Sequence, residues 1–379
     1  MTEAIELGAS GPRRLGAAAR GYLVDLAREL RLSLLGHRWL LGLVLAYWLV
    51  GIAIAYYANL PTGATIETYL PIYMEMMPGM LMTLVIGRCL VIMVIERPAR
   101  PLTQIMGELR GSMFIPRRVA NALPMLVAML VFGGTFTVIK STIPFFHPYS
   151  WDATFEAWDR WLHGGVAPWL LLHPLLGKPI VTHYINIAYA VWFIVLCFTW
   201  VWQVFSLRDE RLRRQFLWTL LVVWILLGNV AATYLSSGGP CYFGRITGLS
   251  DPFQPLMDYL SHANADSPVW ALIAQDVLWQ NYLARDVQLA AGISAMPSLH
   301  VALTTLFSLV CWRTNRWLGA LMTAYALVIM LGSVHLGWHY AIDGYAGALG
   351  TVVIWWIVGW CARKRAAGDP ASAAIVGAG

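Results

Sequence analysis

Long apolar stretches separated by short polar segments dominate the pattern of this sequence. Eight of these stretches are about 20 residues long, which is the length that an α-helix needs to cross a bilayer core. Helices satisfy their own backbone hydrogen bonds, so they can cross the apolar core where most other structures cannot. The sequence therefore predicts an all-α integral membrane protein with about eight transmembrane helices, at residues 39–58, 76–95, 119–139, 180–205, 215–235, 297–312, 317–336 and 339–361.

The polar segments between these stretches have a biased charge distribution. Basic residues collect in the N-terminal segment, in the loops 96–118, 206–214 and 313–316, and directly after the last span. All of these segments lie on one side if every span crosses, as the positive-inside rule expects of cytoplasmic loops. On the opposite side, the loop 236–296 has two arginines and five aspartates. We therefore expect both termini to be cytoplasmic.

The composition supports a membrane protein and narrows its function. Hydrophobic residues make up 59% of the 379 residues, and charged residues make up only 12%. A soluble protein has about twice that charged fraction. The net charge of +6 comes from the clustered loops. Because these charges form no basic face, we expect no nucleic-acid binding. The five cysteines include no CxxC pair and no disulfide pattern.

These patterns divide the chain into four parts. Residues 1–38 predict a basic cytoplasmic segment that contains an amphipathic helix. Residues 39–118 hold two extra spans and a basic inner loop. Residues 119–361 are expected to form a six-helix catalytic core. Residues 362–379 are small and polar and predict a disordered cytoplasmic tail.

One amphipathic segment, residues 151–162, lies in the loop after the third span. Phe155, Trp158 and Leu162 recur at helical spacing, and acidic residues occupy much of the remainder. We interpret this segment as a helix along the outer membrane interface. A lid over an active site is the alternative.

Two polar clusters stand at the outer ends of predicted spans. In the first, Pro297 and Ser298 precede His300 at a helix start, where free N–H groups and the helix dipole favour a bound anion. In the second, His339 and Asp343 are four residues apart and share a helix face. The carboxylate can fix the tautomer of the imidazole and leave its other nitrogen as a nucleophile.

Together these side chains form a complete set for covalent phosphoryl transfer. His339 is the candidate nucleophile, Asp343 orients it, and His300 serves as general acid. A metal site is an alternative, because His335, His339 and Asp343 recur every four residues. Gly337, however, places His335 in the turn before the last span. We therefore expect neither a metal nor a cofactor.

The stretches Met296-Pro-Ser-Leu-His300 and His339-Tyr-Ala-Ile-Asp343 resemble the second and third motifs of the type-2 phosphatidic acid phosphatase superfamily. The Pro-Ser-Leu-His form, together with His-Tyr-x-x-Asp and the segment 157–164, is similar to its inositolphosphotransferase branch. That branch includes fungal inositol phosphorylceramide synthase. The resemblance covers about residues 119–361.

This resemblance implies a role for each motif residue. It implies that His339 forms a phosphohistidine, that Asp343 orients it, and that His300 protonates the leaving group. It also implies that Ser298 and nearby amides hold the phosphate.

The chain departs from the superfamily at its basic residues. The first motif, a Lys followed after six residues by Arg-Pro, is missing, because Arg97-Pro98 has no such Lys and falls on the cytoplasmic side. Ser333 stands where the superfamily has an Arg before the nucleophile. Arg245, which follows the fifth span, and Arg285 are therefore our candidates for binding the phosphate.

The sequence thus predicts a lipid phosphotransferase that moves a phospho-head group between membrane lipids, with its active site on the outer face. Hydrolysis of a phospholipid or polyprenyl phosphate by a lipid phosphate phosphatase stays open, because the same residues can activate water. A lipid transporter is the alternative from another class. Glu75 and Arg88, near the Pro78-Gly79 break, are the residues that favour it.

Overall fold

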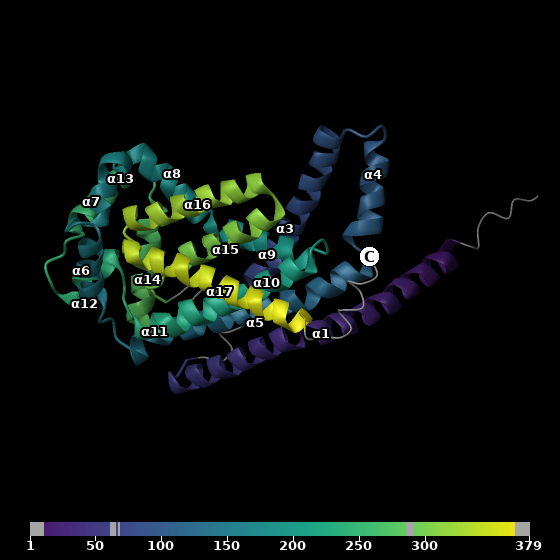
Figure 1. The fold of residues 1–379 in the computed structure, drawn as a ribbon, viewed down its shortest axis with the longest axis horizontal. Coiled ribbons are helices and arrows are strands. Elements are labelled where there is room, and N and C mark those ends of the chain that lie inside the picture. Colours follow the sequence, from purple (N-terminus) through teal and green to yellow (C-terminus); the bar gives the residue numbers. More distant parts are fainter. Residues whose placement is uncertain (1–10, 61–65, 67–68, 286–291, 368–379) are drawn as a thin grey trace, which may run out of the picture.

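The apolar stretches fold into a bundle of long helices, as a computed structural model of the chain shows (Figure 1). The structure describes residues 11–60, 66, 69–285 and 292–367. In this part of the chain, seven helical segments are long and apolar enough to cross a membrane. The shorter apolar helix α15 (Leu299–Thr314) is the eighth. The chain is a multi-pass integral membrane protein, and the prediction of about eight spans is confirmed.

The long helices follow the predicted spans closely. They are α1 (Gly11–Tyr57), α3 (Leu70–Leu90) continued by η1 (Val91–Glu96), α5 (Pro116–Phe146), α8 (Pro179–Ala190) followed by α9 (Trp192–Phe205), α10 (Glu210–Ile225) continued by η3 (Leu226–Ala231) and α11 (Ala232–Tyr234), α16 (Arg316–His335), and α17 (Ala341–Ala367). Shorter helices connect them, namely α4 (Pro101–Glu108), η2 (Leu109–Met113), α6 (Asp152–Leu162), α7 (Pro168–Leu176), η4 (Pro240–Tyr242), α12 (Phe243–Thr247), α13 (Gln254–Asp266) and α14 (Trp270–Ala284).

Polar side chains in the short loops start several of these helices. The Asn315 side chain accepts hydrogen bonds from the N–H groups of Trp317 and Leu318, and so caps α16. Asp209 caps α10 in the same way, through the N–H of Leu212 at 2.8 Å. Such caps satisfy N–H groups that have no partner inside the helix. The spans can therefore turn back within a few residues.

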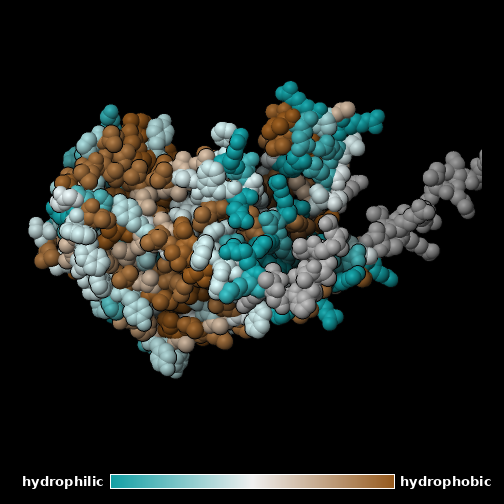
Figure 2. All heavy atoms as spheres, viewed as in Figure 1, coloured by the Kyte–Doolittle hydropathy of each residue, from teal (hydrophilic) through white to brown (hydrophobic). Residues whose placement is uncertain are grey.

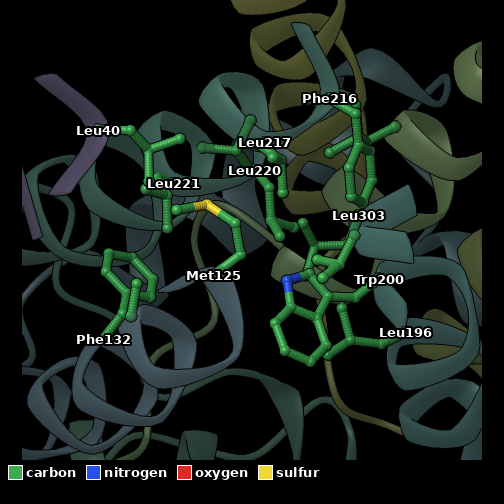
Figure 3. Close-up of a cluster of buried hydrophobic side chains, with 14 of the residues drawn as sticks. Leu40, Met125, Phe132, Leu196, Trp200, Phe216, Leu217, Leu220, Leu221 and Leu303 are labelled. Atoms are coloured by element: carbon green, nitrogen blue, oxygen red, sulfur yellow. The ribbon is translucent and has the colours of Figure 1, made fainter. Parts of the chain in front are cut away.

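The centre of the bundle is filled by large apolar side chains from α1, α5, α9, α10 and α15 (Figure 3). Phe132 and Phe216 are completely buried there, and Trp200 lies beside Leu196. In a membrane such packing stabilises the bundle through close contact rather than through the release of water. Gly51 of α1 shows how close the contact is, since a Cβ there would lie 2.5 Å from the Thr135 side chain of α5.

One end of the bundle carries most of the short helices. Helices α6, α7, α12 and α13 gather at the left of Figure 1, next to the starts of α15 and α17. We call this the histidine end. Figure 2 shows apolar side chains over much of the face formed by α15 to α17, and hydrophilic ones gathered toward the end where α4 lies. This distribution fits a helical bundle whose sides face lipid.

Helix boundaries differ from the prediction at both ends of the chain. The expected N-terminal amphipathic helix and the first span form one continuous helix, α1, of 47 residues. At about 1.5 Å per residue it is about 70 Å long, more than twice the thickness of a bilayer core. Helix α17 continues to Ala367, beyond the predicted start of the tail. Residues 1–10 and 368–379 lie outside the described residues.

Candidate active site

The turn between α16 and α17 positions His339 and Asp343. The Ser333 carbonyl accepts hydrogen bonds from the N–H groups of Trp338 at 2.9 Å and His339 at 3.1 Å. Ser333, which stands in place of the superfamily's Arg, therefore holds this turn together. The His339 Nδ1 atom lies 3.3 Å from Oδ2 of Asp343, and the carboxylate is completely buried. This is the imidazole–carboxylate pair that the spacing of four residues predicts.

The second cluster forms the start of α15. The Ser298 hydroxyl caps the helix by accepting from the N–H of Val301 at 3.5 Å. Its own N–H donates to the Asp343 carbonyl at 3.0 Å, so the two clusters are joined through their backbones. The helix begins at Leu299, which places Pro297 just before the cap and not in the first turn. The predicted role of the Ser298 hydroxyl in phosphate binding stays a prediction.

Two aromatic side chains hold His300 toward His339. The His300 ring stacks on Tyr189, with 4.6 Å between ring centroids, and lies 4.2 Å from the ring of Trp192. The indole N–H of Trp192 donates to the His300 carbonyl at 3.1 Å. The ring centroids of His300 and His339 are 6.3 Å apart. The two imidazoles are therefore close enough to act on one small group between them.

Both histidines line a cavity of about 500 Å³. This volume lies within the range of ligand sites in proteins. The histidine end of the cavity also presents Ser294 and Lys140. Most of the remaining wall is apolar and comes from α3, α5, α9 and α14. Such a cavity suits a ligand with one polar end and a large apolar body.

Lys140 is not among the candidate site residues that the sequence predicts. It lies in the last turns of α5 and is the one Lys or Arg among the described residues that line the cavity. Its charge acts on both His300 and His339. Among the described residues, no carboxylate forms an ion pair with it. Ionisable residues inside spans are costly and are commonly functional. The position of Lys140 at the end of an apolar stretch is therefore the sequence signal that could have identified it.

The two predicted arginines lie elsewhere. The Arg245 guanidinium lies over the Trp279 ring, at 5.3 Å from its centroid, and Arg285 lies over Phe145 at 5.0 Å. Both arginines are exposed, and neither lines the cavity of the histidines. The structure therefore does not bring them together with the triad. Their role in phosphate binding stays a prediction.

His335 is also separate from the pair. Its Nε2 atom lies 2.9 Å from the Thr182 hydroxyl of α8, and the side chain is completely buried. Among the described residues, no three His, Cys, Asp or Glu side chains converge as metal ligands would.

Helix α6 supplies two buried aspartates that sequence reasoning missed. Asp152 accepts hydrogen bonds from the N–H groups of Gly238 and Gly239 and from the Tyr340 hydroxyl. Asp159 accepts from the N–H groups of Ala341 at 2.9 Å and Ile342 at 3.1 Å, in the first turn of α17. Burial raises the pKa of both carboxyl groups, and these donors oppose the rise. The two aspartates therefore fix the turn that carries His339.

The helix predicted for residues 151–162 is thus present, but its acidic residues do not all face water. Asp152 and Asp159 are only 1% and 4% exposed, and Phe155 between them is fully buried. Trp158 and Leu162 are both more than half exposed and face away from the protein. The reason is that N–H groups inside the protein bind these carboxylates. The free N–H groups at the start of α17 bind Asp159, and those of Gly238 and Gly239 bind Asp152.

Gly239 brings the loop after the fifth span against the same turn. Its φ of +95° is one that other residues rarely adopt, and a Cβ there would lie 2.6 Å from the Trp338 carbonyl. The loop predicted to replace the first motif therefore packs directly behind His339.

A comparison with known families bears on this site. The model of the PAP2 superfamily matches residues 153–357, which is more than half of the chain. The chain belongs to the PAP2 superfamily. Members of this superfamily are phosphatases and phosphotransferases, so the protein is an enzyme of that type. No curated protein and no solved structure gives a significant match.

The PAP2 match divides the site into two parts. His300, His339 and Asp343 lie inside the matched residues. Helices α1, α3 and α5 lie outside them, and with α5 lies Lys140. The histidine cluster thus stands in the part shared with the PAP2 superfamily, and part of the cavity wall does not.

Proposed function

We propose that this enzyme is a lipid phosphotransferase that moves a phospho-head group from one membrane lipid to another through a phosphohistidine on His339. The observation that carries this proposal is the placement of two imidazoles, with 6.3 Å between their ring centroids, at the polar end of a largely apolar cavity. A phospholipid has the matching shape, with a phosphate at one end and hydrocarbon beyond it.

In the first step, His339 attacks the phosphorus atom. Its Nδ1–H donates to Asp343, which leaves the lone pair of Nε2 free to form the N–P bond. The bond between phosphorus and the oxygen of the donor lipid alcohol breaks. His300 gives its proton to that oxygen, so the alcohol leaves neutral. Asp343 stabilises the positive charge that develops on the ring of His339.

In the second step, a hydroxyl group of the acceptor lipid attacks the same phosphorus. His300, now neutral, takes the hydroxyl proton. The N–P bond breaks and its electron pair returns to His339. Both residues end in their starting protonation states, so the cycle closes without a cofactor.

Lys140 is the residue that we assign to the charge of the phosphate. It lines the cavity beside both histidines, and phosphate oxygens would be its nearest anionic partners. An ammonium group near the transferred phosphoryl group stabilises the charge that develops on its oxygens. This assignment gives Lys140 the task that the missing first motif leaves open.

Two observations favour a lipid alcohol over water as the acceptor. His339 is only 7% exposed, and the cavity that reaches it is lined mainly by apolar side chains. Water is disfavoured in such surroundings, whereas an apolar alcohol is not. The Pro-Ser-Leu-His sequence before α15 is also similar to the inositolphosphotransferase branch of the superfamily. This similarity supports the proposal that the chain is a member of that branch.

The orientation that we propose puts both termini in the cytoplasm and the histidine end on the outer face. The basic segments 206–214 and 313–316 lie at the opposite end of the helices from His339. Cytoplasmic loops are the ones that gather Lys and Arg.

The test uses the full-length protein in lipid nanodiscs. A panel of phospholipids labelled at phosphorus is supplied with and without lipid alcohols that lack phosphate. We expect a new labelled phospholipid that forms only when an alcohol is present. Labelled inorganic phosphate or a labelled free phospho-head group, without any new phospholipid, would mean that the enzyme is a hydrolase. No labelled product across the panel would contradict both activities.

A matched pair of variants tests the nucleophile. We expect His339→Ala to abolish turnover. It should also abolish the acid-labile phosphorus label that a phosphohistidine leaves on the protein. The control is His262→Ala, which changes an exposed histidine of α13. Appreciable turnover by the His339→Ala variant would overturn the phosphohistidine.

A further inference from the structure

The cavity of the histidines continues far along the bundle axis. Three helices line it over several turns, namely α5 from Met129 to Lys140, α9 from Trp192 to Trp200, and α3 from Tyr73 to Met80. Residues from successive turns of one helix line the wall, so the cavity is a slot that runs along these helices.

The depth of this slot follows from helix geometry. At about 1.5 Å per residue, the stretch of α5 from Met129 to Lys140 rises about 16 Å. A bilayer core is about 30 Å thick, so one leaflet accounts for about 15 Å. The slot therefore extends about as far as one hydrocarbon chain reaches into a leaflet.

Polarity changes in one direction along the slot. Lys140, His300 and His339 stand at one end. At the other end, Met129 lies with Leu196 and Trp200, which contact each other in the core (Figure 3). A ligand that satisfies both ends has an anionic group joined to a hydrocarbon chain.

Helix α3 completes the wall of the slot. It lies outside the match to the PAP2 superfamily, and most of its surface is not covered by other helices. Its slot side carries Tyr73, Met76, Met77 and Met80. Met80 is 6% exposed, whereas Met82, two residues along, is 62% exposed. Methionine side chains are flexible and adapt to apolar ligands of irregular shape.

We infer that α3, together with α5 and α9, forms a binding slot for one hydrocarbon chain of the lipid substrate, and that the methionines of α3 limit the length of this chain. The inference rests on the proposed function, because it places the phosphate of that substrate beside Lys140. The chain can belong to a fatty acyl lipid or to a polyprenyl phosphate, since both present the same apolar surface.

Photo-crosslinking tests the slot without any turnover. The full-length His339→Ala protein in nanodiscs is incubated with a phosphatidic acid, or with a polyprenyl phosphate, that has a diazirine near the end of its chain. We expect labelled peptides to carry the modification at Met76, Met77 or Met80. The lipid that labels these residues more strongly identifies the source of the chain. Labelling confined to Met82 and other exposed positions would overturn the slot.

A second experiment tests the limit on length. The larger side chain of Met80→Trp should lower kcat/KM for the longest chains about tenfold or more relative to short ones, by analogy with the cost of small misfits in an apolar pocket. The matched control, Met82→Trp, adds the same side chain on the exposed side of α3 and should change that ratio less than about twofold. Equal effects of the two variants would overturn the inference. If phosphate transfer persists while both tests fail, the slot is wrong and the proposed function stands.

Discussion

Replacing Asp159 by Asn tests how the turn of His339 is held. The carboxylate accepts two backbone hydrogen bonds at the start of α17, and its side chain is buried. Asn keeps one acceptor oxygen but turns an amide group toward the other N–H. The Ala341 or Ile342 N–H therefore loses its partner. His339 lies two residues before Ala341, so its ring depends on this anchor.

The magnitude follows from the bond that is lost. A hydrogen bond to a charged group contributes about 1.5–3 kcal/mol, and Asn recovers part of this because a buried charge is removed. We expect unfolding to become easier by about 1–2 kcal/mol. Activity should fall more steeply, since a shift of about 1 Å in a catalytic group can cost about a hundredfold in rate. We expect kcat to fall at least tenfold, with KM changing little.

The assay combines phosphate transfer in nanodiscs with thermal unfolding in detergent. The control is Glu156→Gln on the same helix, which breaks an ion pair with the partly exposed side chain of Arg160. Such pairs contribute at most about 1 kcal/mol, so both its kcat and its stability should stay near those of the unchanged protein. If Asp159→Asn lowers kcat no more than Glu156→Gln does, the aspartate does not position His339.

Three further predictions follow from other contacts. Lys140→Met should raise KM for a phospholipid about tenfold or more, because a charge-assisted contact is lost; Lys178→Met, which changes an exposed lysine, should not, and steady-state kinetics compares them. Gly347→Ala should impair both folding and turnover, since its Cβ would lie 2.5 Å from the Ser298 carbonyl, whereas Gly42→Ala meets nothing within 4 Å; yield and thermal unfolding measure the difference. Burial raises the pKa of Asp152 above the unfolded value of about 3.9. The protonated carboxyl group therefore stabilises the fold below a pH of about 3.9, and this stabilisation is lost as the pH rises through the raised pKa. As the pH rises through this acidic range, the unfolding temperature should therefore fall less in the Asp152→Asn variant than in the unchanged protein.

The long spans could be predicted from the sequence because membrane burial leaves a strong signal. About 20 apolar residues in a row have few alternatives to a transmembrane helix. Helix ends were harder to place, since they depend on single caps. At α15, the Ser298 cap sets the start at Leu299, two residues after the predicted start at Pro297.

The pair of His339 and Asp343 could also be predicted, because a spacing of four residues is a local property of a helix. Its neighbours could not. In α6, the residues Asp152, Phe155 and Asp159 recur at the same spacing as Phe155, Trp158 and Leu162. Periodicity favours both faces equally, and it does not show which face packs against the protein. The positions of α17, whose first N–H groups Asp159 binds, and of the loop at Gly238, whose N–H groups Asp152 binds, decide between the two faces.

The place of Lys140 in the candidate site could not be predicted from the sequence either. The sequence shows that Lys140 ends an apolar run. The two histidines that line the cavity with it, however, come from α15 and from the turn before α17, far along the chain. The proposed catalytic residues lie inside the region shared with the PAP2 superfamily, whereas Lys140 and the methionines of α3 lie outside it. On the proposed mechanism, the shared part performs the phosphoryl transfer and the extra helices hold the phosphate and the hydrocarbon chain. Changes in the methionines of α3 should therefore alter which lipid reacts without altering the phosphohistidine, because α3 contributes no group that binds the phosphate or that forms or breaks a bond.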